Sequence, residues 1–188
     1  YATILRGLGA VQLKAGKYRV DFGKLNLLHP HAYSFLDIPL VHEELFGPEG
    51  LADIGVNVNG QLPLQTSVIT LSGNVLKGDF AEEHAHDHED DEAVVGVRAL
   101  TAAFRGEALQ ADEDAETDIG YSERVGLFVP TGEYAGFEAG INALQGTLDQ
   151  RTGREVELLG ADVKYRWAPD KFRSLTVQGE WIRSDRDV

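Results

Sequence analysis

Residues 159–181 contain two segments that alternate strictly between apolar and polar side chains, joined by a short polar turn. In the first segment one face carries Leu159, Ala161, Val163, Tyr165 and Trp167, and the other face carries Asp162, Lys164 and Arg166. The second segment, 175–181, repeats this pattern. Successive side chains of a β-strand point to opposite sides, so each segment predicts a strand with one apolar and one polar face. Aromatic residues stand near the ends of both apolar stripes, which is typical of a transmembrane β-barrel.

The same alternation recurs along most of the chain and predicts an all-β fold. Segments with this pattern are 1–7, 11–22, 53–62, 66–77, 119–129, 137–145, 159–167 and 175–182. No apolar run approaches the roughly 18 residues that a transmembrane helix requires. A barrel strand is apolar on one face only and therefore escapes such a search. We expect an antiparallel transmembrane β-barrel, with about eight strands in this chain.

The connections between these segments alternate between short and long. Short turns are predicted near 8–10, 63–65, 130–135 and 168–173. Outer-membrane barrels have short periplasmic turns and long extracellular loops. We therefore interpret 24–51 and 79–117 as long extracellular loops of a single barrel domain that covers 1–188. Residues 93–109 suit either a helix or a strand, and the alternation of connections favours a short helix within the loop, or a structure folded over the barrel mouth.

Both ends of the chain suggest a barrel that continues beyond it. The first residue is not methionine, and the segment at 1–7 starts abruptly. The segment at 175–182 is followed by a polar end without an aromatic terminal residue. We expect the barrel to be incomplete at both ends, with further strands outside these residues.

Composition argues against two classes of function. The 188 residues carry a formal net charge of −14, and no basic stripe is present that could neutralise the phosphates of a nucleic acid. The chain has no Cys, and it shows no Gly-rich phosphate loop, no GxSxG motif and no HExxH motif. We therefore expect neither a nucleic-acid-binding protein nor an enzyme.

Several motifs resemble those of a known family. They are Lys14-Ala15-Gly16-Lys17, Phe22-Gly23, Leu25-Asn26, His29-Pro30-His31, Asp37-Ile38-Pro39-Leu40-Val41, Gly47-Pro48-Glu49-Gly50-Leu51, Gly160-Ala161-Asp162, Tyr165-Arg166-Trp167 and Gln178-Gly179-Glu180. Apart from 79–117, the chain resembles bacterial outer-membrane porin-like proteins that are similar to phosphate-selective porins and often described as zinc-regulated outer-membrane receptors. The resemblance implies a barrel in the lipid bilayer of a Gram-negative-type outer membrane. No plug domain is recognisable, which favours an open or loop-constricted pore.

The most distinctive chemical feature is the run EEHAHDHEDDE at 82–92. Imidazole nitrogens and carboxylate oxygens suit Zn²⁺, Cu²⁺ or Ni²⁺, and His-rich tracts are typical of metal binding. We predict a divalent metal site, with Zn²⁺ favoured, whose ligands come from Glu83, His84, His86, Asp87, His88 and Asp90. The alternative is a solvated acidic loop that binds nothing in particular.

A second group of histidines lies in the first long loop, at His29, His31 and His42. If the two long loops lie close together, these residues could share a metal with the first group. The alternative is that they pack and form hydrogen bonds within an ordered loop.

The charged faces of the strands predict the lining of a pore. Its residues are Lys14, Lys17, Arg19, Arg124, Glu138, Asp162, Lys164, Arg166 and Glu180. Lys17 and Arg19 join Lys14 on this face because the alternation slips at Gly16–Lys17, which predicts a β-bulge. Charged rings tune ion selectivity, and the mixture of signs argues against a strongly anion-selective pore. The alternative is a salt-bridged interior that selects no particular solute.

Three functions are compatible with these features. The first is an outer-membrane porin or transporter that captures divalent metal at its acidic, His-rich loops and passes ions or small solutes, alone or as a homo-oligomer. The second is a soluble metal-binding β-protein, and the third is a structural surface protein bridged by metal ions. The apolar face discriminates between the first two, because it should meet lipid in one and a protein core in the other. All six histidines lie in the two long loops, which favours the first.

Overall fold

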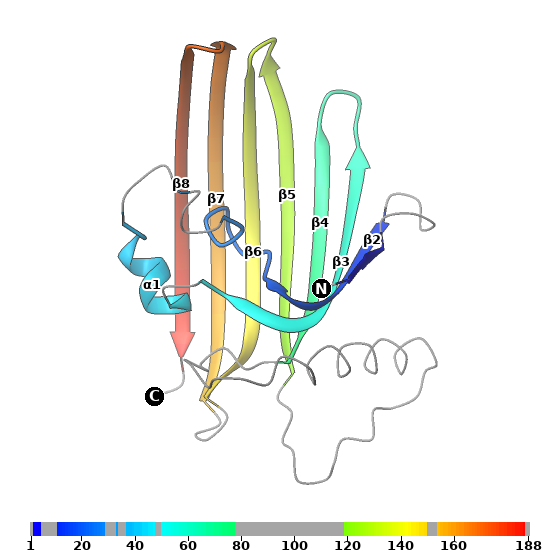
Figure 1. Ribbon diagram of the computed structural model, residues 1–188, viewed down its shortest axis with the longest axis vertical. Coiled ribbons are helices and arrows are strands. Elements are labelled where there is room, and N and C mark those ends of the chain that lie inside the picture. Colours follow the sequence, from blue (N-terminus) through cyan, green and yellow to red (C-terminus); the bar gives the residue numbers. More distant parts are fainter. Residues whose placement is uncertain are drawn as a thin grey trace.

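The computed structural model describes residues 2–4, 11–28, 33, 37–47, 50–77, 119–149 and 154–186. Within these residues the chain forms eight strands and one short helix (Figure 1). The strands are β1 (Ala2–Ile4), β2 (Val11–Arg19), β3 (Ala52–Pro63), β4 (Val68–Leu76), β5 (Gly120–Gly132), β6 (Ala135–Asp149), β7 (Arg154–Asp170) and β8 (Arg173–Arg186). The helix α1 (Leu40–Phe46) lies between β2 and β3 in sequence.

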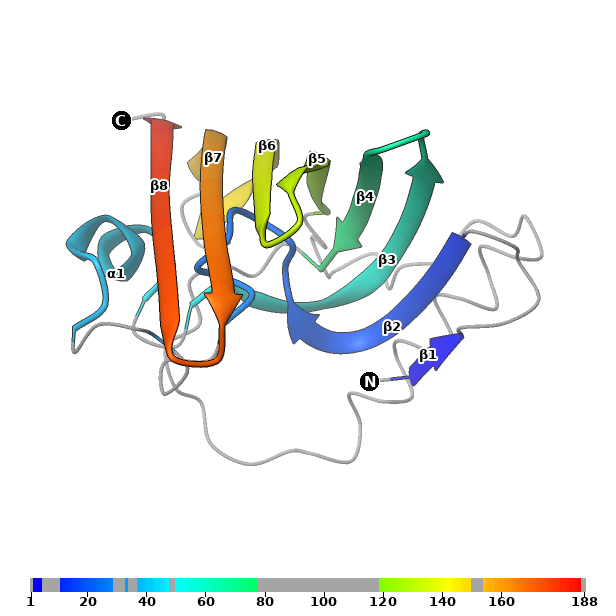
Figure 2. The ribbon, with the colours of Figure 1, turned by 90° about the horizontal axis from the view of Figure 1, so that it is seen from above.

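All eight strands belong to one antiparallel sheet, in which each strand pairs with the next along the chain. The predicted all-β, antiparallel fold is therefore confirmed. Figure 2 shows the sheet curling: β8 to β4 form one wall, and β3, β2 and β1 bend round below it. Within the described residues β1 and β8 are opposite edges and do not pair, so this part of the sheet is open and not closed into a barrel.

Strand ends differ from the sequence prediction mainly where two paired strands extend into polar sequence. β6 and β7 pair from Ala135↔Trp167 to Asp149↔Arg154, so that both strands run on into polar sequence beside 150–153, which lie outside the described residues. β7 also continues to Asp170, which shortens the turn expected at 168–173. Backbone pairing continues after the apolar alternation has ended, because it depends on N–H and C=O groups that every residue except proline provides. No described helix is long and apolar enough to cross a membrane.

The predicted β-bulge at Gly16–Lys17 is wrong. β2 pairs with β3 in unbroken register through Ala15↔Val56, Gly16↔Gly55 and Lys17↔Ile54. Gly16 has a φ of 113°, so the irregularity is one of backbone dihedral angle and inserts no residue. Residues 93–109, for which helix and strand were both considered, lie outside the described residues.

The two faces of the sheet differ as the alternation predicts: the apolar face is exposed and the polar face is buried. Apolar residues of the outer, convex face are exposed: Val58, Leu71, Val75, Tyr121, Val125, Leu127, Ile141, Leu159, Val163, Trp167, Leu175, Val177 and Trp181. Polar residues of the inner face are buried: Asp53, Asn57, Ser72, Asn74, Ser122, Arg124, Asn142 and Asp162. Ile54, Val56 and Ile69, also expected on the apolar face, are half-buried. The sheet therefore has the opposite polarity to a layer of a soluble sandwich.

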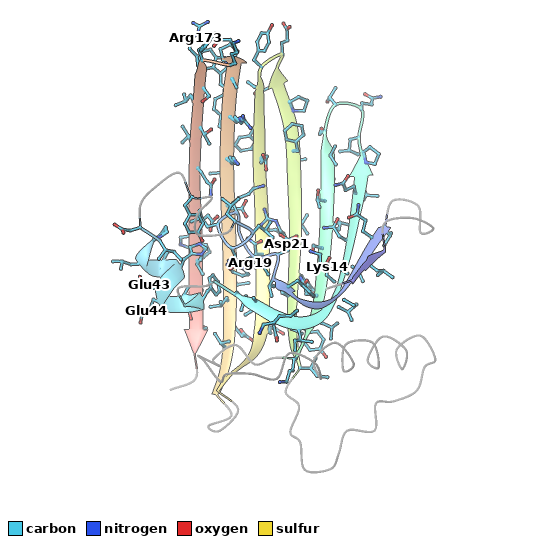
Figure 3. All side chains as sticks on the ribbon, viewed as in Figure 1. Lys14, Arg19, Asp21, Glu43, Glu44 and Arg173 are labelled. Atoms are coloured by element: carbon cyan, nitrogen blue, oxygen red, sulfur yellow. The ribbon has the colours of Figure 1, made fainter. Side chains whose placement is uncertain are left out.

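The chain that follows β2 covers the inner face. We call residues 20–28, 37–47 and 50–51, which include α1, the inner segment. Figure 2 shows residues 20–28 on the concave side of the sheet and α1 beside β8. A small apolar core joins the inner segment to the sheet, through Tyr18, Val20, Phe22, Leu51, Leu76, Leu144, Val156 and Leu158, with Leu45, Phe46 and Ile182 packed against it. These described parts of the loop predicted at 24–51 are thus folded against the sheet, with Glu43 and Glu44 on the exposed side of α1 (Figure 3).

Candidate functional site

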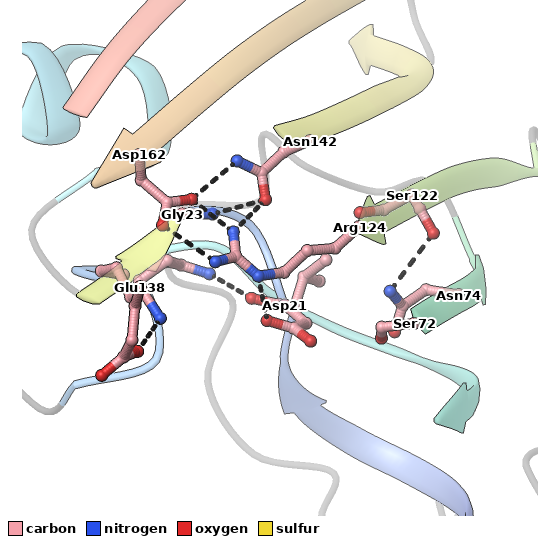
Figure 4. A network of polar contacts seen from close by, with 12 residues as sticks. Asp21, Gly23, Ser72, Asn74, Ser122, Arg124, Glu138, Asn142 and Asp162 are labelled. Carbon is pink, nitrogen blue, oxygen red and sulfur yellow. Dashed lines mark hydrogen bonds and ion pairs between the residues drawn. The ribbon is translucent and has the colours of Figure 1, made fainter. Parts of the chain in front are cut away.

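The inner face of β5, β6 and β7 carries a buried ion pair. Arg124 on β5 donates to Asp162 on β7 through Nη1 to Oδ2 at 2.6 Å and through Nη2 to Oδ1 at 2.9 Å. The two side chains are only 7% and 1% exposed. Asn142 on the intervening β6 accepts from Arg124 and donates to Asp162 Oδ2 at 3.2 Å (Figure 4). This charge-assisted, two-bond arrangement joins three strands across the inner face.

A glycine makes room for this ion pair. Gly140 lies on β6, directly between Gly126 of β5 and Asp162 of β7. A Cβ atom at this position would lie 2.5 Å from Arg124 Nη2 and 2.8 Å from Asp162 Oδ2. Any side chain at 140 would therefore displace the guanidinium group as it crosses β6.

The start of the inner segment is attached to this ion pair. The Gly23 backbone N–H donates to Asn142 Oδ1 at 3.1 Å, and Lys24 Nζ forms an ion pair with Glu138 of β6. Asp21 Oδ1 lies 3.6 Å from Arg124 Nε. Burial raises the pKa of the Asp21 carboxyl, and the nearby Arg124 guanidinium opposes that increase. The segment is therefore held on the concave face of the sheet by specific polar contacts as well as by its apolar core.

Glu180 of β8 binds two separate parts of the inner segment. Its Oε1 accepts hydrogen bonds from the backbone N–H of Lys24 at 2.6 Å and of Leu25 at 2.7 Å. Its Oε2 lies 2.8 Å from Nε2 of His42, which belongs to α1. Gly23 has a φ of 68°, which favours glycine, and a Cβ there would lie 2.8 Å from Glu180 Oε2.

An uncharged cluster continues along the inner face of the curled strands. Tyr18 donates its hydroxyl to Asn74 Oδ1 at 3.2 Å. Asn57 Nδ2 donates to Ser72 Oγ and to Asn74 Oδ1, both at 2.9 Å, and Asn74 Nδ2 donates to the Ser122 carbonyl at 3.3 Å. Side-chain hydrogen bonds therefore link strands on the inner face from β2 to β7. The bonds on β2 to β5 join amides and hydroxyls, and those on β5 to β7 join Arg124 to Asn142 and Asp162.

The register places the residues predicted to line a pore on both faces. Arg124, Glu138, Asp162, Lys164, Arg166 and Glu180 share the inner face of β5 to β8. Lys14 pairs with Asn57 and is also inner, with Nζ 5.2 Å from the centre of the Tyr18 ring. Lys17 pairs with Ile54 and Arg19 with Ala52, which alternate with Asn57 and so lie on the other face. Their predicted place beside Lys14 is wrong because the strand contains no bulge, but the Arg19 side chain still reaches the inner segment, where Nη1 donates to the Leu28 carbonyl at 3.4 Å.

The predicted metal ligands fall mostly outside the described residues. This applies to Glu83, His84, His86, Asp87, His88 and Asp90, and to His29 and His31. His42 is described, and its Nε2 is engaged by Glu180. In the part of the chain that the structure describes, no three His, Cys, Asp or Glu side chains gather as a metal site would require.

Sequence reasoning missed the residues that hold the inner segment together. Asn26 Nδ2 donates to the carbonyls of Val20 at 2.7 Å and Leu51 at 2.9 Å, and its Oδ1 accepts from Leu51 N–H at 2.7 Å. Asn142 and Lys24 were missed as well. The available signal was Gly140 followed two residues later by Asn142 on the polar face of a strand, because a small and an amide residue side by side leave space for a partner.

Comparisons with known proteins give little further information. No family model matches the chain, and no solved structure matches it. The chain is similar to an uncharacterized protein of Aquifex aeolicus (strain VF5). The two are 30% identical over an alignment of 193 positions, which covers 96% of this chain. The chain spans 37% of the length of that relative.

Proposed function

We propose that this chain is part of a β-barrel in the outer membrane of a Gram-negative-type bacterium, and that the barrel passes ions or small solutes. The observation that carries this proposal is the polarity of the sheet. Ile141 is 63% exposed and Val163 is 48% exposed on the outer face, whereas Arg124 and Asp162 are buried on the inner face. A continuous exposed apolar surface of this kind is stable when lipid covers it.

The extent of the apolar stripe on β7 fits a bilayer. From Leu159 to Trp167 the outer residues are apolar or aromatic, and Glu157 lies beyond one end. Eight residue steps of about 3.3 Å give about 26 Å along the strand. At a strand tilt of about 40° this is about 20 Å along the membrane normal, close to the apolar band of about 25 Å in outer-membrane barrels. Trp167 at the end of the stripe would lie at the membrane interface.

The open edges of the sheet suggest how the barrel is completed. β1 and β8 present unpaired backbone groups within the described residues, and such groups are not tolerated facing lipid. We propose that further strands pair with these edges and close a larger barrel. The similar protein from Aquifex aeolicus extends well beyond the matched region, which is compatible with this proposal.

The inner segment would narrow such a pore. It lies on the concave side of the sheet and is attached to β6 and β8 through Asn142, Glu138 and Glu180. Charged groups of both signs line the same face, so a small polar or ionic solute suits the lumen better than an apolar one.

Metal capture remains part of the proposal through the acidic, His-rich run at 82–92. Calorimetric titration of the protein with Zn²⁺ tests it, with a variant in which His84, His86 and His88 are replaced by Ala. We expect the variant to lose most of the binding, because imidazole nitrogens are the strongest zinc ligands available there. Equal affinity of the two proteins would remove this run from the mechanism.

Two measurements test the barrel and the pore separately. A membrane sheet should remain monodisperse only in detergent or lipid, and a chain that stays monodisperse without detergent would contradict the membrane assignment. Conductance across a planar lipid bilayer tests the pore. A protein that inserts into the bilayer without conducting would support a structural role instead.

A further inference from the structure

Glu180 occupies a position from which one carboxylate holds two parts of the inner segment. Its Oε1 binds the backbone of Lys24 and Leu25, and its Oε2 contacts His42 of α1. We propose that Glu180 is a positioning residue that sets the width of the pore by holding the inner segment in the lumen. This inference rests on the proposed pore function.

The site around Glu180 is built for a carboxylate. The side chains of Glu180 and His42 are 7% and 2% exposed, and a buried charge of this kind is stable only when donors surround it. The two backbone N–H groups and the imidazole supply them, through charge-assisted hydrogen bonds that are stronger than neutral ones. Gly23, with its φ of 68°, leaves the space that the carboxylate needs.

The other attachments of the inner segment are of a different kind. Lys24 and Glu138 form their ion pair with side chains that are partly exposed. Asp21 stands 3.6 Å from Arg124, and the bond from Gly23 to Asn142 joins a neutral donor to a neutral acceptor. Loss of the Glu180 carboxylate would leave Lys24 tied to Glu138 through its side chain, and α1 packed against the apolar core through Leu45 and Phe46. It would release the backbone of Lys24 and Leu25, and the imidazole of His42, from β8. We expect the lumen to widen beside β8.

Thiol labelling tests the holding role without any measurement of transport. The chain has no Cys, so Leu25→Cys introduces a single thiol at a position that is 8% exposed. A charged thiol reagent should modify this thiol at least about tenfold faster when Glu180 is replaced by Ala, a factor equivalent to about 1.4 kcal/mol, and less markedly faster with Glu180→Gln, which keeps one acceptor. The control is Glu123→Gln on the outer face of β5, which should leave the rate unchanged.

Single-channel recording in planar bilayers then tests the effect on width. We expect Glu180→Ala to conduct more than the wild-type protein and to admit larger uncharged polymers, and we expect Glu123→Gln to match the wild type. If Glu180→Ala fails to fold, His42→Gln removes the imidazole that contacts Glu180 and Phe46 but leaves both backbone donors to Glu180, and it should raise both readouts to a smaller degree.

The outcomes separate this inference from the function on which it rests. Unchanged labelling of the thiol introduced by Leu25→Cys would overturn the holding role. Faster labelling with unchanged conductance would overturn the claim that Glu180 sets the width. A wild-type protein that does not conduct would refute the pore, whereas the labelling result would still decide whether Glu180 holds the segment.

Discussion

Replacing Val163 with Arg distinguishes a lipid-facing surface from a water-facing one. Val163 lies at the midpoint of the apolar stripe on β7 and is half exposed on the outer face. In a bilayer, an Arg at the centre of a barrel strand costs about 2–4 kcal/mol of folding free energy. At a water-exposed position without special contacts, the same change costs no more than about 0.5 kcal/mol. The two environments therefore predict clearly different results for one variant.

Position along the strand provides the matched control. Leu159 faces the same side as Val163 and lies four residues away, which is about 13 Å along the strand and about 10 Å along the membrane normal at a tilt of about 40°. Leu159→Arg should therefore cost about 0–1 kcal/mol, because the penalty falls towards the interface. Denaturant titration of the protein refolded into phosphatidylcholine vesicles, followed by Trp fluorescence, measures both values. Equal or negligible costs at the two positions would refute the lipid-facing assignment.

Three further predictions concern the polar contacts of the sheet. Asp162→Asn should destabilise the protein by about 3–5 kcal/mol in the same titration, because it leaves the Arg124 charge buried without its counter-ion. Replacing Asp162 and Arg124 together by Leu and Met should cost less than the single change. An equal or greater cost of the double change would contradict the role of the unpaired charge. Gly140→Val should destabilise the protein by a similar amount, because a side chain at 140 would prevent the Arg124–Asp162 contact. An NMR spectrum of the variant in which the Arg124 side-chain resonance is unshifted would contradict the steric argument. At the β7–β8 turn, beyond the apolar stripe, hydrogen bonds from Arg173 lower the pKa of Asp170. The contact therefore stabilises the turn at pH values above the ordinary carboxyl pKa, and this stabilisation is lost as the pH falls through the lower pKa of the folded state. Arg173→Ala should raise the pKa of Asp170 in an NMR titration, and an unchanged pKa would exclude Arg173 as the cause.

The sheet could be predicted because its signal is local and repetitive. A period of two specifies both the strand and the face of each residue, and it identified the outer residues of β5 to β8, such as Val125 and Val163, without knowledge of their partners. It failed at Gly16, where a glycine between Ala15 and Lys17 resembled a phase slip although the pairing with β3 is unbroken. A glycine carries no hydrophobic information, so the phase on either side of it is set by pairing alone.

The inner segment could not be predicted because its contacts are distant in sequence. Nothing near Lys24 or His42 indicates that both meet Glu180, since the donors to that carboxylate include backbone groups that every sequence provides. The prolines and glycines of 24–51 indicated irregular backbone, which the structure shows at 24–28, whereas Leu40–Phe46 is the helix α1. Irregular backbone can project from a sheet or fold onto it. The polar residues Asn142 and Glu138, which decide between these arrangements, lie more than 100 positions away.

The span of these contacts also imposes an order on folding. The residues that receive the inner segment lie on β6 and β8, and Glu180 is separated from Lys24 by 156 positions. The segment is synthesised early, yet its binding surface exists only after the later hairpins have formed. Contacts between such distant positions carry a large loop-closure entropy and slow the folding of β-proteins. The concave face should therefore close last, and the intermediate before it would present Arg124, Asp162 and Glu180 on an uncovered sheet.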